Sequence, residues 1–342
     1  DDDELEVIIG GFSGGDGRKL FAFNHDMTPV LGFPILIGEK IKKGASLADF
    51  NNNGKDDIVF GTDSDNIYLI LDDGSVADGF PFETNGKIHS SPAILDINGN
   101  ITIIAGSNDN FLYSINSDGS LHFSFEAEGD VSTSPSILNY LNNCYIVFGD
   151  DEGYLYVLDT NGNQHINFPQ FIGSNISESI VFSDLNYDSH PEIIFGTDNG
   201  EMHAIQLNGN SYNHMPIEYP FSYYSSPTIN DIDGDNDLEI LAGTSLSINI
   251  FDIKDYGTPD SYWSTYKGNP QRTGYFLFIP FCDFGDINGD LMIDVSDIIL
   301  QINFILNLYE PNASEVCASD LDSNGTIDLL DIILLINIIL ER

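Results

Sequence analysis

Two twelve-residue acidic loops near the C-terminal end of the chain carry the side chains best suited to chemistry. They run from Asp286 to Asp297 and from Asp320 to Asp331. Each places oxygen-bearing side chains at loop positions 1, 3, 5, 9 and 12, and position 7 offers a backbone carbonyl. These positions are Asp286, Asn288, Asp290, Met292, Asp294 and Asp297 in one loop and Asp320, Asp322, Asn324, Thr326, Asp328 and Asp331 in the other. Such spacing lets the backbone wrap a hard cation with six or seven oxygens, so the sequence predicts two calcium sites.

Each loop leads directly into an apolar segment, and we expect helices over residues 297–306 and 331–340. The first has one apolar stripe, whereas the second is apolar almost all round and requires cover on more than one side. Both are too short to span a bilayer, which takes about 20 residues. A partner or the rest of the chain is therefore expected to cover what the two helices cannot hide from each other.

The duplicated unit resembles a type I dockerin module over residues 282–342. The matching motifs are GDINGD and SDLDSNGTID, each followed by DIIL. An ordinary calcium-binding helix–loop–helix has Glu at position 12, whereas dockerins have Asp, as both loops do here. One departure is Leu291, which stands at position 6 of the first loop where glycine usually makes the sharp turn. The resemblance implies that the loops bind calcium and that the helices engage a cohesin domain.

Residues 1–275 form a repeat that must position any further sites. An apolar run that ends in glycine recurs at nearly even intervals along this part of the chain. The glycines are Gly10, Gly61, Gly106, Gly149, Gly196 and Gly243. In four units an Asp-Gly or Asn-Gly pair follows at a constant offset, which indicates a tight hairpin.

Each unit offers about four short strands, and a period of roughly 40–50 residues with this content is typical of a β-propeller blade. The predicted fold is therefore mainly β: a six-bladed β-propeller of four-stranded blades over residues 1–280. A small α-helical domain with the tandem calcium loops follows over residues 281–342.

Three units keep a nine-residue acidic loop before the apolar run. They resemble FG-GAP/VCBS propeller repeats through LADFNNNGKDDIVFGT, FSDLNYDSHPEIIFGT and INDIDGDNDLEILAGT. The resemblance implies calcium bound at positions 1, 3, 5, 7 and 9, with position 7 giving its carbonyl. The positions are Asp49, Asn51, Asn53, Lys55 and Asp57; Asp184, Asn186, Asp188, His190 and Glu192; and Asp231, Asp233, Asp235, Asp237 and Glu239. A solvated Asp/Asn turn is the alternative for each loop. The shorter loops near Asp96 and Asn139 are expected to bind no metal.

The first unit begins inside such a loop, because Glu6 precedes Gly10 at the same offset as the final acid precedes its glycine in the other loops. This blade lacks its inner strand, and we expect residues 275–281 to supply it and to close the ring. The segment WSTYKGNPQRTGYF (263–276) is similar to the closing or flanking segment of bacterial propellers of this kind. A chain that starts at Asp1, without an initiator Met or signal peptide, is expected to derive from a longer secreted precursor.

The chain carries 54 acidic residues against 11 Lys and Arg, a formal net charge of −43. Phosphate backbones would be repelled, which argues against nucleic-acid binding, whereas bound divalent cations would offset part of the self-repulsion. Cys282 and Cys317 precede the two C-terminal loops, so a disulfide between them is expected in an oxidising compartment. Cys144 is expected to be a buried strand residue without a partner.

The sequence offers no catalytic constellation. Residues 11–15 match the G-x-S-x-G pattern, but that motif requires a strand leading into a helix, and here it falls in a glycine-rich hairpin. The seven His residues show no paired metal spacing. We therefore expect no enzyme.

The favoured interpretation is a secreted calcium-binding scaffold in which the propeller is the body and the dockerin-like pair is the connector. Its partner would be a cohesin-like domain, or a neighbouring copy in a fibre or lattice, bound through helices 297–306 and 331–340. One alternative is a non-catalytic accessory region of a secreted hydrolase. Another is a carbohydrate-binding propeller, for which Tyr219, Tyr223 and Tyr224 are the best candidates.

Overall fold

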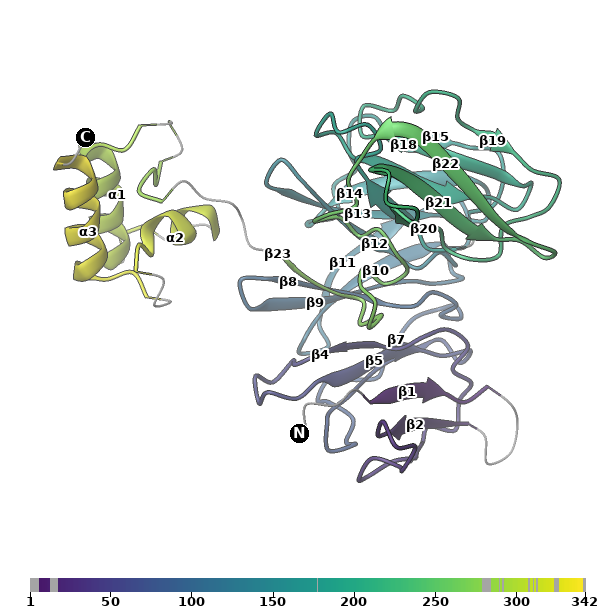
Figure 1. Cartoon of the computed structure of the whole chain (residues 1–342). Helices are drawn as coiled ribbons and strands as arrows, with labels where there is room; N and C mark the ends of the chain where they lie inside the picture. The colour runs from purple at the N-terminus through teal and green to yellow at the C-terminus, as the bar shows by residue number, and fades with distance from the viewer. Residues whose placement is uncertain are drawn as a thin grey trace. The chain divides into compact units, whose positions relative to one another are not determined.

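The computed structural model describes residues 6–12, 18–176, 178–278, 284–288, 290, 292–306, 308–309, 311, 313–322 and 326–340. The chain divides into two compact units, Asp1–Leu277 and Phe278–Arg342. All helices of the described residues lie in the second unit, whereas the first is built from strands (Figure 1). The predicted combination of a mainly β body and a small helical C-terminal domain is confirmed.

Six small sheets follow one another along the chain, and consecutive strands within each pair antiparallel. The first three comprise β1 (Val7–Gly10), β2 (Lys19–Phe23) and β3 (Ile35–Leu36); β4 (Ser46–Ala48), β5 (Asp57–Gly61), β6 (Asn66–Ile70) and β7 (Phe82–Glu83); and β8 (Ala93–Ile97), β9 (Asn100–Gly106), β10 (Phe111–Asn116) and β11 (Leu121–Glu126), with β23 (Tyr275–Phe278) added beside β8. The last three comprise β12 (Ser136–Tyr140), β13 (Asn143–Gly149), β14 (Tyr154–Asp159) and β15 (Gln170–Phe171); β16 (Val181–Ser183), β17 (Glu192–Gly196), β18 (Glu201–Gln206) and β19 (Ile217–Glu218); and β20 (Thr228–Asn230), β21 (Asp237–Gly243) and β22 (Ile248–Tyr256).

The apolar runs of the repeat are β1 in the first sheet and the second strand in each of the other five sheets. They are continuous because each middle sheet is covered on both faces. Every residue of β5 is buried. One face of its sheet packs against the first sheet around Leu20 and Ile41, and the other packs against the third sheet around Ile94 and Ile103. Strands buried on both faces read as unbroken hydrophobic runs and not as alternating ones.

The glycine that ends each run marks the closest approach between one sheet and the segment that enters the next. A Cβ atom at Gly61 would stand 2.0 Å from Ile88 Cγ2, and one at Gly106 would stand 2.4 Å from the carbonyl oxygen of Val131. At Gly149 it would stand 2.5 Å from Ile176 Cβ. Only hydrogen fits there, so the recurring glycine sets how tightly successive sheets pack.

One segment, residues 258–274, connects sheets that are far apart in sequence; we name it the crossing segment. Its backbone carbonyls accept hydrogen bonds from the first strands of four sheets. The donors are the amides of Phe182 and Ile229, to Trp263 and Ser264, and those of Leu47 and Ile94, to Thr273 and Gly274. The crossing segment, which includes most of the sequence motif at residues 263–276, therefore holds these four sheets together through their first strands.

The expected closure by residues 275–281 is wrong for the part that the structure describes. Strand β23 adds to β8 of the third sheet and not to β1 of the first, and the hydroxyl of Tyr275 donates to Asp96 (2.8 Å). The reason is the crossing segment, which already runs along β8 when it reaches Gly274. Val7 and Ile9 on the first sheet and Ile248 and Ile250 on the last remain exposed.

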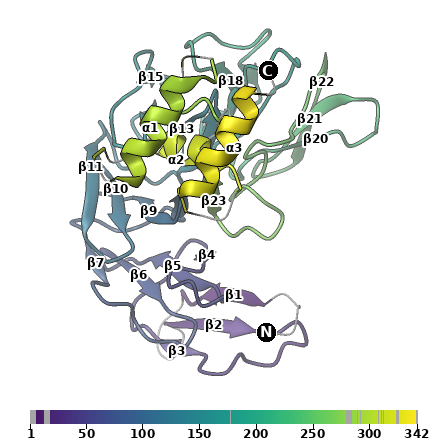
Figure 2. The ribbon, with the colours of Figure 1, turned by 90° about the vertical axis from the view of Figure 1, so that its left-hand side faces the viewer.

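The second unit contains α1 (Val295–Ile305), α2 (Ala313–Ser319) and α3 (Leu329–Leu340). Helices α1 and α3 lie side by side (Figures 1 and 2) and correspond to the two predicted helices. The short α2 was not expected from the sequence. A small core of Ile287, Phe304, Ala318 and Leu335 holds the three together.

Candidate calcium centres

The second C-terminal loop brings its acids together. One carboxylate oxygen each from Asp320, Asp322 and Asp331 lies within 4.8 Å of the others, and Asp331 is fully buried. Three hard oxygens this close, on positions 1, 3 and 12 of the loop, suit a calcium ion, which takes six to eight oxygen ligands. Asn324, at position 5, lies outside the described residues.

A buried Asp331 organises this loop through backbone amides. Its Oδ1 accepts from the amides of Leu321 (2.9 Å) and Asp322 (3.3 Å), and its Oδ2 accepts from that of Asp328 (2.8 Å). These bonds join the start of the loop to its end and place Asp328 at the start of α3. Position 9 accepts the amide of Leu330 (2.7 Å).

The first C-terminal loop repeats this arrangement. Asp297, also fully buried, accepts from the amides of Ile287 (2.8 Å), Asn288 (3.1 Å) and Asp294 (2.9 Å). Asp294 is the N-cap of α1, and the two acids form a capping box. Leu291, which stands where glycine is usual, lies outside the described residues.

The remaining ligand positions of the first loop turn toward one another. The amide of Asp290 donates to Asp286 (3.1 Å) and to Asn288 (2.9 Å), and that of Met292 donates to Asp290 (2.9 Å). Asp286 is nearly buried. The loop thus has the curvature that a cation requires, with the oxygens of positions 1, 3 and 5 on its inner side.

The three loops of the β body share one geometry with each other. In each, the final acid accepts the amide of position 2: Phe50 to Asp57 (3.0 Å), Leu185 to Glu192 (2.9 Å) and Ile232 to Glu239 (2.7 Å). These acids are at most 5% exposed. All three loops therefore curl back onto a buried carboxylate.

Position 1 of these loops also accepts backbone amides from the far side of the turn. Asp49 accepts from Asn53 and Gly54. Asp184 accepts the equivalent amides, those of Asp188 and Ser189. Asp231 accepts the amides of Gly234 and Asn236, at positions 4 and 6. In the middle of the loops, the amides of Lys55, His190 and Asp237, at position 7, donate to Asn53, Asp188 and Asp235, at position 5.

Of these three loops, the one over residues 231–239 gathers carboxylates most closely. Asp231 and Asp233 form a group with Glu239, and Asp235 and Asp237 form a second group with the same Glu239, each group within 4.8 Å. A carboxylate oxygen of Asp237 is buried without a hydrogen-bond partner among the described residues. A divalent cation would satisfy that oxygen and neutralise the crowded acids.

Burial raises the pKa of two of the final acids. Desolvation raises the pKa of Glu192 to about 7, against hydrogen bonds from Leu185 and Gln206 that lower it. Desolvation likewise raises the pKa of Asp57. A buried carboxylate that is costly to ionise alone is well suited to pair with a bound cation.

The two shortened loops are plain two-residue hairpin turns. Asn98 and Gly99 join β8 to β9 with positive φ angles of 52° and 83°, and Leu141 and Asn142 join β12 to β13 with 48° and 59°. Asp96, which would be position 1, instead accepts the amide of Gly99 (2.7 Å). A two-residue turn leaves no room to wrap a cation.

The supports of the final acids could not be foreseen from the loop spacing. Gln206 of β18 donates its side-chain amide to Glu192 (3.0 Å), and the backbone amide of Asp72 donates to Asp57 (2.9 Å). These donors come from the third strand and from the chain just after it. The only sequence signal is that both donors follow their acid at nearly the same offset.

Both long helices of the second unit present an exposed apolar face, and the two faces match residue for residue. The exposed residues are Val295, Ile299 and Ile302 on α1 with Leu306 at its C-cap, and Leu329, Ile333, Ile336 and Leu340 on α3. Each residue of one set occupies the same position in its repeat as its counterpart in the other set. The prediction that the two helices cannot hide their apolar surface from each other is confirmed within this unit.

Two of the three cysteines, Cys144 and Cys317, lie within the described residues. Cys317 is disulfide-bonded, whereas Cys282 lies outside the described residues. Cys144 is free and buried, and burial raises the pKa of its thiol to about 12.

Tyr223 cannot be a sugar platform, because it is 1% exposed and packs on Gly196, whereas Tyr224 is exposed. Ser13 of the G-x-S-x-G pattern lies outside the described residues.

Residues 284–340 match the Dockerin type I domain family. Type I dockerin domains bind Ca²⁺ through EF-hand-like loops, so calcium is a cofactor of this chain. Dockerin domains bind cohesin domains in extracellular protein–protein assemblies. The curated proteins contain no match to the chain.

Two solved structures illustrate the likeness of the β body. BBS1N, crystallised in complex with ARL6DN and soaked with lead, is 12% identical, with a TM-score of 0.51 over 75% of this chain and 77% of that chain. The computationally designed Ika8 protein is 11% identical, with a TM-score of 0.51 over 72% of this chain and 71% of that chain. At such identities the likeness concerns the fold alone, which is β-rich with propeller-like neighbours.

Among the described residues, no helix has the length and apolar character needed to cross a membrane.

Proposed function

We propose that this protein is a secreted, calcium-dependent scaffold whose dockerin domain attaches the β body to a cohesin-like domain. The observation that carries the proposal is the duplicated apolar face on α1 and α3. Eight exposed aliphatic side chains in so small a unit form a surface that is stable in water only when covered. Their residue-for-residue correspondence ties this surface to the calcium loops that start both helices.

Calcium would act here by fixing the starts of the two helices. Asp297 and Asp331 each join the beginning of a loop to the first turn of a helix, and a cation on the same carboxylates would lock that geometry. Without the cation, the acids of each loop would repel one another, and the helix starts would loosen. Chelation is therefore expected to remove the partner surface and not only the metal.

The β body, in this proposal, is a six-bladed propeller of the FG-GAP/VCBS type. Its support is the six consecutive sheets, the period of the close-packed glycines and the loops that precede β5, β17 and β21. Closure of the ring would bring together the exposed faces of the first and last sheets, which include Val7, Ile9, Ile248 and Ile250. The boundary to the dockerin domain would lie near residue 280, and calcium in the three loops would brace the blades.

The test is complex formation with a type I cohesin domain, measured by size-exclusion chromatography with light scattering, in calcium and in EGTA. We expect a complex in calcium that EGTA dissociates. The double variant Ile299→Asn/Ile333→Asn should abolish it, because it places a polar group on both faces. The matched control is Leu31→Asn, which changes a side chain 95% exposed on the β body.

A complex that forms equally in EGTA, or that tolerates the double variant, would contradict the proposal. In the second form of the proposal, the partner is another copy of this chain. Sedimentation velocity without cohesin distinguishes self-association from cohesin binding. Particles larger than one chain that disappear in EGTA and in the double variant would identify a neighbouring copy as the partner.

A further inference from the structure

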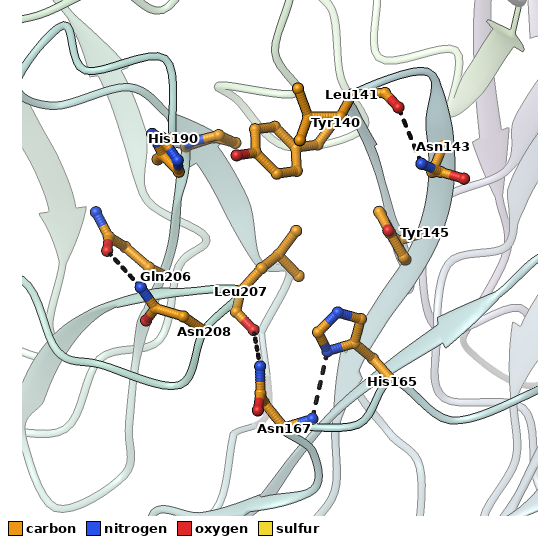
Figure 3. Close-up of a pocket in the computed structure, with 11 residues that line it drawn as sticks. Tyr140, Leu141, Asn143, Tyr145, His165, Asn167, His190, Gln206, Leu207 and Asn208 are labelled. Carbon is orange, nitrogen blue, oxygen red and sulfur yellow. Dashed lines mark hydrogen bonds between the residues drawn. The ribbon is translucent and has the colours of Figure 1, made fainter. Parts of the chain in front are cut away.

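A cavity of about 250 Å³ lies between the fourth and fifth sheets of the β body (Figure 3). Its walls come from β12 and β13 on one side and from the loop before β17 and the end of β18 on the other. Tyr140, Tyr145, His165 and Leu207 surround one space in Figure 3, and the Tyr140 hydroxyl points toward His190.

The lining combines ring and amide chemistry without charge. The aromatic and imidazole rings are those of Tyr140, Tyr145, His165 and His190; the amides are those of Asn143, Asn167, Gln206 and Asn208. Of the described residues that line the cavity, none is Lys, Arg, Asp or Glu. Ligand sites typically pair apolar and aromatic walls with a few placed polar groups, and this set suits a neutral molecule with both C–H faces and hydroxyls.

Several polar atoms of the lining remain available to a ligand. Asn167 donates its side-chain amide to the Leu207 carbonyl (3.0 Å), which fixes the side chain and leaves its Oδ1 without a partner among the described residues. Within the same residues, the hydroxyls of Tyr140 and Tyr145 also lack hydrogen-bond partners. Each hydroxyl can donate and accept, and the amide oxygen can accept.

The size and surroundings narrow the class of ligand. Ligand pockets usually measure about 300–1,000 Å³, so this cavity admits one ring and not a chain. An anionic ligand is disfavoured by the strongly negative chain. A pyranose offers C–H groups to an aromatic face and hydroxyls to amide and phenol groups.

The cavity also touches the acidic loop of the fifth sheet. His190, at position 7 of that loop, lies with its ring 5.9 Å from the ring of Tyr140. Gln206, in the same wall as His190, donates its side-chain amide to Glu192, the final acid of the loop (3.0 Å). The loop that would hold a cation therefore contributes to one wall of the cavity, directly through His190 and through the bond of Glu192 to Gln206.

We propose that this cavity binds a single neutral sugar ring and that calcium in the loop over residues 184–192 is required for binding. The calcium requirement rests on the role proposed above for that loop, whereas the sugar site rests on the cavity itself. Tyr140 and Tyr145 supply the ring contacts, and Asn167 and the two phenol hydroxyls supply the hydrogen bonds.

The experiment is saturation-transfer NMR with glucose, galactose, mannose, xylose and N-acetylglucosamine as probes, on the full chain in calcium. At least one sugar should bind, and Tyr140→Ala should weaken it about tenfold or more, the size expected for loss of an aromatic contact. Tyr140→Phe keeps the ring and should lose less. Tyr224→Ala, at an exposed tyrosine outside the cavity, is the matched control and should bind as the unchanged protein does.

The calcium requirement is tested by Asp184→Asn against Asp231→Asn, the same change in the loop of the last sheet. Sugar binding should be lost only in the former, with calcium stoichiometry measured on both by calorimetry. Binding retained by Asp184→Asn after calcium loss from its loop would overturn the requirement alone. The sugar site would be overturned if none of the five sugars bound. It would also be overturned if the cavity bound the cation tetramethylammonium instead of a sugar, or if Tyr224→Ala weakened sugar binding as much as Tyr140→Ala does.

Discussion

At the scale of single residues, the recurring device is a buried carboxylate that holds backbone amides at both ends of a loop. Asp297 and Asp331 each accept three amides. In the β body, Glu192 and Asp57 each accept the backbone amide of loop position 2 and one further N–H group from outside the loop. A carboxylate so placed has two functions: it shapes the loop, and it offers charge to a cation. Charge-assisted bonds of this kind are the stronger ones.

The change Asp331→Asn keeps the shape of the side chain and removes its charge, so it tests both functions of the carboxylate. The amide loses the charge and turns a donor toward backbone N–H groups, which should destabilise the dockerin domain by about 2 kcal/mol or more. Calcium stoichiometry from calorimetry should fall by one, with a lower melting temperature by circular dichroism. Asp260→Asn, at an exposed site, is the control; equal stoichiometry and stability in both variants would contradict the assignment.

Lys267 is the buried cation of the crossing segment. It is 3% exposed, it donates to the carbonyl of Ala45 and to the Ser46 hydroxyl (3.1 Å), and its ammonium lies 5.9 Å from the centre of the Tyr266 ring. No carboxylate among the described residues forms an ion pair with it. Burial lowers the pKa of Lys267 to about 7.

This lowered pKa predicts a pH dependence of stability. Between about pH 7 and its ordinary value of 10.5, the unfolded chain binds the proton that folded Lys267 has released. Stability should therefore rise with pH through this window, by a few kcal/mol at most. Urea unfolding at pH 7 and 9.5 in saturating calcium measures the rise, which Lys267→Met should remove. Lys42→Met, at an exposed lysine, should keep it, and an equal slope in both variants would refute the cause.

At the scale of elements, the glycine that ends each apolar run controls how closely the sheets stack. The neighbour is usually a branched side chain or a backbone carbonyl from the segment that enters the next sheet. Because protein interiors are close-packed, such a contact leaves no space for even one methyl group. The repeat therefore keeps glycine for packing and not for a turn.

The change Gly106→Ala tests this role. Its Cβ would meet the Val131 carbonyl at 2.4 Å, and backbone cannot move aside as a flexible side chain can. We expect a loss of about 1–3 kcal/mol, measured by urea unfolding followed through the buried Trp263. Gly243→Ala occupies the same repeat position but meets only the Ser225 side chain, at 3.0 Å, and should cost less. An equal loss in both would argue against sheet packing as the cause.

At the scale of the whole molecule, two compact units with separate cores share one chain. Their acidic loops differ in length, twelve residues against nine, but both kinds end in a buried acid. A ligand that binds only the folded state stabilises it in proportion to RT ln(1 + [L]/Kd). Calcium should therefore act on both units, each according to its own affinities.

Differential scanning calorimetry should show two transitions, one for each unit. Calcium at about 100 times a site's dissociation constant would add roughly 2.7 kcal/mol per site, so both transitions should move upward between EGTA and calcium. The variant Asp331→Asn should reduce the shift of the dockerin transition only. A single cooperative transition, or a body transition that ignores calcium, would contradict this division.

The sequence alone determined the features that depend on local spacing. The twelve-residue loops, the helices they start and the six apolar runs all follow from offsets within one unit. A loop can wrap a cation only if its oxygens recur at fixed positions, so the signal lies in neighbouring residues. The dockerin domain was predicted from such residues, and its family match confirms it.

Only the tertiary structure decided what distant segments do. It showed that β23 joins β8, that the crossing segment bonds to four sheets, that Tyr223 is buried, and that Tyr140, Asn167 and Gln206 line one cavity. These contacts join residues from different sheets, and no offset within a repeat encodes them. Packing and backbone hydrogen bonding choose among many pairings of similar local propensity, and that choice is made by the fold as a whole.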